Sequence, residues 1–66
     1  MQCCINGKPV SLPAGTTLAA YLADAGIPEK GLVVERNGEV LDPTDWPSTV
    51  LGEADQVELI AFVTGG

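Results

Sequence analysis

The chain has 66 residues and a mass of 6.8 kDa, with nine acidic residues, three basic residues and a formal net charge of -6. A chain of this length builds one hydrophobic core, and its hydrophobic content of 45% is that of a globular domain. Three cations cannot neutralise a run of phosphates, so we expect no nucleic-acid partner. The absence of histidine removes the commonest general base and zinc ligand, so we expect no catalytic residues and no metal site.

The two cysteines, Cys3 and Cys4, are adjacent, and in an extended strand they point to opposite faces. They close no useful disulfide loop and are too few for an iron-sulfur or zinc site. We interpret Cys3 as a small core residue beside Ile5 and Cys4 as outward-facing, with a sulfur-relay role as the alternative. The N-terminus does not resemble a leader sequence, and no apolar run approaches the roughly 20 residues that span a bilayer. We therefore expect a cytoplasmic protein without membrane contact.

Two Asn-Gly dipeptides predict two β-hairpins, because Asn-Gly favours the positive φ values of a type I′ turn. The dipeptides and their flanking segments are Asn6-Gly7 between residues 1–5 and 8–12, and Asn37-Gly38 between residues 32–36 and 39–41. Between the hairpins, Thr17 is placed to cap a helix with apolar residues Leu18, Leu22 and Ala25 on one face, which Gly26 ends. This helix of about two turns is too short to persist alone, so its apolar stripe must pack on the strands.

A short helical turn is predicted after the second hairpin, where Asp42 can act as N-cap and Pro43 suits the first helical position. Asp45 adds an acid in the first turn, so capping explains this acidic pair better than cation binding does. The turn is expected to bring Trp46 to the edge of the core and to end at Pro47.

The last predicted strand covers residues 56–63, which are rich in β-branched and large apolar side chains. Alternation divides it into an expected core set, Val57, Leu59, Ala61 and Val63, and an expected exposed set, Glu58, Ile60 and Phe62. A single helix covers one side of a sheet, so we interpret the exposed set as a partner-docking patch. Burial of Phe62 by loops and dimerisation are the alternatives. The acidic residues Glu53, Asp55 and Glu58 either steer basic partners or form a solvated face.

The element order ββαββ, helical turn, β predicts an α+β fold of the β-grasp kind, with a mixed sheet of about five strands and one helix packed across one face. We expect residues 1–63 to form the domain and residues 64–66 to form a C-terminal tail. Gly65 and Gly66 directly follow the last strand and leave a carboxylate on a tether without side chains.

The whole chain resembles the ThiS family, the ubiquitin-like β-grasp sulfur carriers of thiamine biosynthesis. The features that carry the resemblance are Asn6-Gly7, Gly15-Thr16-Thr17-Leu18, Gly26-Ile27-Pro28, Glu35-Arg36-Asn37-Gly38-Glu39-Val40, Trp46, Asp55, Val57-Glu58 and Gly65-Gly66. One departure is Ala54, where the family usually carries glycine in the turn before the last strand. An alanine at positive φ there would cost about 1 kcal/mol.

The resemblance implies that Gly66 is adenylated and then converted to a thiocarboxylate, with Gly65 and Thr64 completing the tail. It implies three partners: an E1-like adenylating enzyme that uses ATP and Mg²⁺, thiazole synthase, and a cysteine desulfurase or other sulfur donor. The alternatives are a β-grasp carrier for molybdopterin or cysteine synthesis, a ubiquitin-like protein modifier, and a binding module whose tail is inactive. The recipient pathway, the sulfur donor and the oligomeric state stay open at this point.

Overall fold

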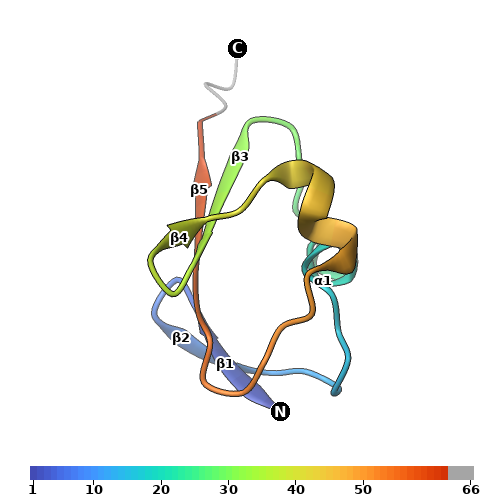
Figure 1. The fold of residues 1–66 in the computed structure, drawn as a ribbon, viewed down its shortest axis with the longest axis vertical. Helices are drawn as coiled ribbons and strands as arrows, with labels where there is room; N and C mark the ends of the chain where they lie inside the picture. Colours follow the sequence, from blue (N-terminus) through green and yellow to red (C-terminus); the bar gives the residue numbers. More distant parts are fainter. Residues whose placement is uncertain (63–66) are drawn as a thin grey trace.

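The computed structural model describes residues 1–62, and these form one mixed sheet with helices on one side. The elements are β1 (Gln2–Ile5), β2 (Lys8–Ser11), α1 (Leu18–Ala25), β3 (Leu32–Arg36), β4 (Glu39–Val40), the 3-10 helix η1 (Pro43–Ser48) and β5 (Gln56–Ala61). The strand order is β2-β1-β5-β3-β4, with β5 parallel to β1 and antiparallel to β3. Figure 1 shows α1 and η1 on the same side of this sheet. The predicted fold class is confirmed.

Both predicted hairpins form around their Asn-Gly turns. Asn6 and Gly7 have φ values of 53° and 79°, and Asn37 and Gly38 have values of 52° and 83°, as a type I′ turn requires. The two asparagine side chains also reach the central strand, because Asn6 Oδ1 accepts from the Leu59 N–H at 2.7 Å. Asn37 Oδ1 accepts from the N–H at the start of β5 at 2.9 Å. Each turn is therefore hydrogen-bonded to β5 through its asparagine side chain.

Helix α1 begins and ends as predicted, but its buried face differs by one residue. Thr17 Oγ1 accepts from the Ala20 N–H at 3.1 Å, and Leu18 and Leu22 are fully buried. Ala25, expected on the buried stripe, is exposed. The reason is the left-handed residue Gly26, after which the Ile27 N–H donates to the Leu22 carbonyl at 2.9 Å in a Schellman motif. This reversal packs Ile27 against the core in place of Ala25.

The predicted turn after the second hairpin is η1, and it is longer than expected. Asp42 Oδ1 accepts from the Thr44 N–H at 3.0 Å and from its hydroxyl at 2.8 Å, and these bonds hold the pKa of Asp42 below its usual value. Pro47 does not end the helix, because the Thr49 N–H donates to the Trp46 carbonyl at 3.3 Å and closes a further turn. Trp46 is 1% exposed and lies inside the core and not at its edge.

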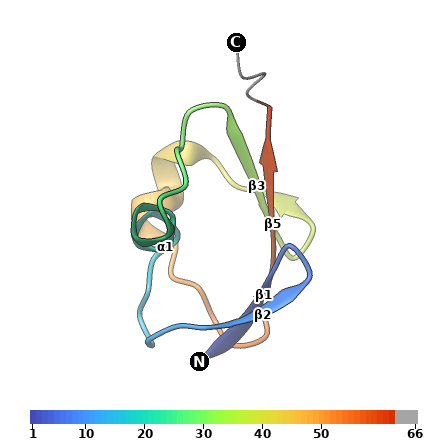
Figure 2. The same cartoon turned by 180° about the vertical axis from the view of Figure 1, so that it is seen from behind.

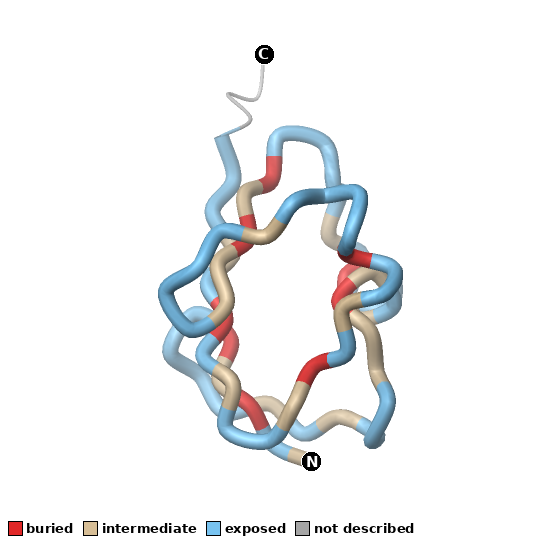
Figure 3. The backbone as a smooth tube through the Cα atoms, viewed as in Figure 1, coloured by how far each residue is buried: buried red, intermediate tan, exposed pale blue. Residues whose placement is uncertain are grey.

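The core lies between the sheet and the two helices, as the buried segments in Figure 3 show. Its buried side chains are Cys3, Ile5, Leu18, Leu22, Leu32, Val34, Trp46, Leu51 and Val57. Cys3 is buried and Cys4 only partly so, as predicted. Burial, together with the nearby carboxylate of Asp55, raises the pKa of the Cys3 thiol, so this side chain stays protonated and behaves as a small apolar group.

Ala54 adopts a left-handed conformation with φ of 66°, and its N–H donates to the Gln2 carbonyl at 2.8 Å. Replacing Ala54 by glycine is expected to raise the free energy of unfolding by about 0.5–1 kcal/mol, because glycine adopts positive φ without Cβ strain. Ala54→Val is the opposite control and should lower it, since a β-branched residue is strained most there. Urea unfolding measures both changes. Equal stability of the three chains would contradict a strained alanine.

No helix within residues 1–62 is long and apolar enough to cross a membrane. In the same part of the chain, no three or more Cys, Asp or Glu side chains gather in a way that could hold a metal ion.

Candidate functional site

The exposed end of β5 carries the apolar side chains that the sequence singled out. Ile60 and Phe62 are 36% and 68% exposed, while Val57 on the alternate face is 1% exposed. The Phe62 N–H donates to the Gly31 carbonyl at 2.8 Å, which holds the end of the strand against the loop between α1 and β3. The predicted division of β5 into an inner and an outer face is therefore confirmed at these positions. Val63 lies outside the described residues.

Ala61, expected in the core, is exposed, and Leu59 is only partly buried. Helix α1 crosses the sheet away from this end, so the last residues of β5 extend beyond it (Figure 2). Ala61 instead lines an open, largely apolar hollow of about 320 Å³ with Ile27, Pro28, Lys30 and Leu32.

The register between β3 and β5 adds residues to the outer face that sequence reasoning missed. Ile60 pairs with Val33, and Glu58 pairs with Glu35, which in turn pairs with Val40 on β4. We call the resulting surface the outer patch; it consists of Val33, Glu35, Val40, Glu58, Ile60 and Phe62. Alternation about the buried residues Leu32 and Val34 could have placed Val33 and Glu35 on one face, but not opposite β5.

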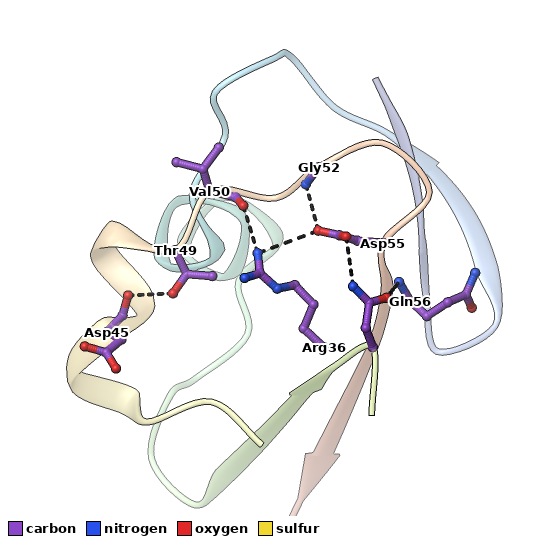
Figure 4. A network of polar contacts seen from close by, with 8 residues as sticks. Arg36, Asp45, Thr49, Val50, Gly52, Asp55 and Gln56 are labelled. Atoms are coloured by element: carbon purple, nitrogen blue, oxygen red, sulfur yellow. Dashed lines mark hydrogen bonds and ion pairs between the residues drawn. The ribbon is translucent and has the colours of Figure 1, made fainter. Parts of the chain in front are cut away.

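Arg36 lies on the other side of the sheet and takes part in a polar network shown in Figure 4. Its Nη1 donates to the Val50 carbonyl at 2.9 Å and lies 3.7 Å from Asp55 Oδ2. Asp55 Oδ2 also accepts from the Gly52 N–H at 2.8 Å, so this carboxylate organises the turn before β5.

The other carboxylate of that turn, Glu53, accepts from the Gln2 N–H at 2.9 Å. Two of the three acidic residues considered for steering thus have structural contacts, and only Glu58 belongs to the outer patch.

The predicted tail residues Thr64, Gly65 and Gly66 lie outside the described residues. The strand that leads to them ends at the same end of the molecule as the loop between α1 and β3 (Figure 1).

A mixed sheet in which a central C-terminal strand runs parallel to the first strand, crossed by one helix, defines a β-grasp protein. Residues 3–66 match the model of the ThiS family, and the chain belongs to that family.

Solved structures and curated relatives agree with this assignment. The crystal structure of the thiamine biosynthesis protein ThiS from Geobacter metallireducens matches with a TM-score of 0.84 and 29% identity, over 100% of both chains. The sulfur carrier protein ThiS from Thermus thermophilus is 36% identical over 62 residues, which are 94% of this chain and 95% of the relative.

Two longer relatives are named thiazole synthase. The protein from Magnetococcus marinus is 38% identical over 66 residues, and that from Paramagnetospirillum magneticum is 30% identical over the same number. This chain spans 20% of the length of each, so each of these proteins contains a segment similar to the whole chain.

Proposed function

We propose that this chain is a sulfur carrier of thiamine biosynthesis, and that Gly66 bears the sulfur as a thiocarboxylate. The observation that carries the proposal is the family match over residues 3–66, because it includes the Gly65-Gly66 tail as well as the folded domain. The thiazole synthases with a segment similar to this chain support thiazole synthase as the recipient of the sulfur.

The proposed chemistry takes place in two steps. A carboxylate oxygen of Gly66 attacks the α-phosphorus of ATP and displaces pyrophosphate, which gives an acyl adenylate. Hydrosulfide, or its equivalent from a sulfur donor, then attacks the acyl carbon, AMP leaves with the C–O bond electrons, and one proton is released. The product is a thiocarboxylate, whose sulfur is a better nucleophile than the original oxygen.

The chain contributes position and not catalysis in this proposal. Strand β5 pairs with β3 as far as Ala61, and the Phe62 N–H donates to the Gly31 carbonyl, so the end of the strand that leads to the tail is held in place. One of the chain's three cations, Arg36, is already bound to Val50 and Asp55, so few cations are free to bind phosphates. ATP, Mg²⁺ and the acid-base groups therefore belong to an E1-like adenylating enzyme, which makes this chain its substrate.

The outer patch is the proposed docking surface for that enzyme. Truncating Ile60 or Phe62 to alanine is expected to weaken binding roughly tenfold each, since an apolar side chain buried in an interface contributes about 1–3 kcal/mol. The melting temperature should change little, because both side chains are exposed in the free chain. A binding titration and a thermal melt separate the two effects.

Val50→Ala is the matched control, since Val50 is 52% exposed and its backbone forms an isolated bridge with Thr17, away from the outer patch. Equal weakening by this control would contradict a specific docking surface. Unfolding of the Ile60 and Phe62 variants would mean that the faces of β5 are assigned wrongly.

The function is tested by intact mass after incubation with adenylating enzyme, ATP and hydrosulfide. Replacement of one oxygen of the chain by sulfur supports a carrier, and transfer of that sulfur to purified thiazole synthase supports the thiazole route. Isopeptide conjugates to lysine would instead indicate a protein modifier. Transfer to an acceptor of molybdopterin or cysteine synthesis, and not to thiazole synthase, would contradict the thiazole route. The proposal that the chain is a sulfur carrier would still stand.

A further inference from the structure

Two carboxylates face each other across the middle of the outer patch. Glu35 on β3 and Glu58 on β5 are direct partners in the antiparallel register. Side chains in such a pair have Cβ atoms about 5 Å apart, and like charges at these positions destabilise a sheet. Glu58 is exposed and Glu35 is half-buried, so both carboxylates border the uncovered face of the sheet.

No cation of the chain lies on this face within residues 1–62. Arg36 pairs with Val57, which is buried in the core, and its guanidinium binds Val50 and Asp55 on that side of the sheet. Lys8 pairs with the buried Ile5 and so shares the inner face, and Lys30 lines the hollow beside Ala61. Among these residues the ion pair that forms is Arg36–Asp55, which leaves the Glu35–Glu58 pair without a cationic neighbour.

Apolar side chains border the acidic pair. The next register pair on the same face of the sheet is Val33 with Ile60, and Val40 pairs with Glu35 from β4. Val40 is 63% exposed, and Phe62 at the end of the strand is 68% exposed. A partner surface that fits this arrangement presents a cation surrounded by apolar groups, because burial of the apolar rim would strengthen the attraction to the paired carboxylates.

Resting on the proposed function, we propose that Glu35 and Glu58 together bind one cationic side chain, an arginine or lysine, of the adenylating enzyme that receives the tail. An arginine can donate to both carboxylates at once through its planar guanidinium. The cation removes the repulsion between the two carboxylates, so a pair that destabilises the free chain stabilises the complex. The acidic pair therefore acts with opposite signs on folding and on binding, because it lowers the stability of the free chain and raises the affinity for the enzyme.

The test compares the parent chain with Glu35→Gln, Glu58→Gln and the double variant. The double variant is expected to melt about 2–6 °C higher, because glutamine keeps the shape and removes the repulsion. Its affinity for the purified adenylating enzyme should fall roughly tenfold or more. Raising salt from about 50 mM to about 500 mM should weaken binding of the parent much more than binding of the double variant. Each single variant should already show most of the thermal gain, since removing either charge ends the repulsion.

Asp24→Asn is the matched control, because it removes one exposed negative charge from α1 on the opposite side of the sheet. It should change the affinity by less than about twofold. An unchanged affinity and salt dependence of the double variant, or a lower melting temperature, would overturn this inference.

Sulfur loading at saturating enzyme separates this inference from the proposed function. The double variant should still be loaded completely, because its tail is intact. If the parent and the double variant are both loaded and bind equally, only the role of the acidic pair is wrong. A parent chain that is never loaded would overturn both proposals.

Discussion

Deleting Gly66, or adding one alanine after it, is expected to abolish sulfur loading and to leave the melting temperature unchanged. Each change moves the terminal carboxylate by about 3.5 Å along the tail, the length of one residue. A misplacement of about 1 Å at a reacting centre already lowers a rate by a large factor. In the proposed function, the added alanine also brings a methyl group to the place where the adenylating enzyme would hold the terminal glycine. A terminal residue beyond the last strand contributes little to folding, so stability should be unaffected.

The measurement is intact mass after reaction with adenylating enzyme, ATP and hydrosulfide, with a thermal melt of each variant. Ser11→Ala is the control, because Ser11 is exposed at the end of β2, an edge strand of the sheet. It should be loaded like the parent. Loading of either tail variant at the parent rate would show that the Gly66 carboxylate is not the site, and the proposed carrier function would fail with it.

Trp46→Ala is expected to cause the largest loss of stability of any single substitution considered, about 3–5 kcal/mol. Trp46 is the largest of the fully buried side chains, and η1 holds it against α1. A chain of 66 residues has a total stability of about 3–10 kcal/mol, so this loss is a large fraction of the total. Circular dichroism during thermal and urea unfolding measures the effect.

Trp46→Phe should cost much less, about 1–2 kcal/mol, since phenylalanine keeps most of the aromatic volume. The indole Nε1 of Trp46 has no hydrogen-bond partner among the described residues, so phenylalanine loses no bond there and removes a buried polar atom. If Trp46→Phe is as unstable as Trp46→Ala, then Trp46 does not stabilise the fold mainly by filling volume in the core.

Local backbone chemistry could be read from the sequence because its signals lie within a few residues of one another. The two Asn-Gly turns, the Thr17 cap and the Gly26 stop all act over three or four neighbouring positions, and each is present. The exact ends of these elements were harder to predict from the sequence. Ile27 replaces Ala25 on the core because the chain reverses after Gly26, and the turn at Trp46 continues because later backbone and hydroxyl groups close it.

The sequence by itself therefore determined the elements, the β-grasp class and the exposed face of the last strand, since alternation and turn preferences are short-range properties. Only the tertiary structure decided that β5 is the central strand and that Glu35 stands opposite Glu58. It likewise turned Asp55 from a candidate steering charge into the partner of Arg36. The physical reason is that strand order and register depend on how distant segments share one core, and many pairings satisfy the same local pattern.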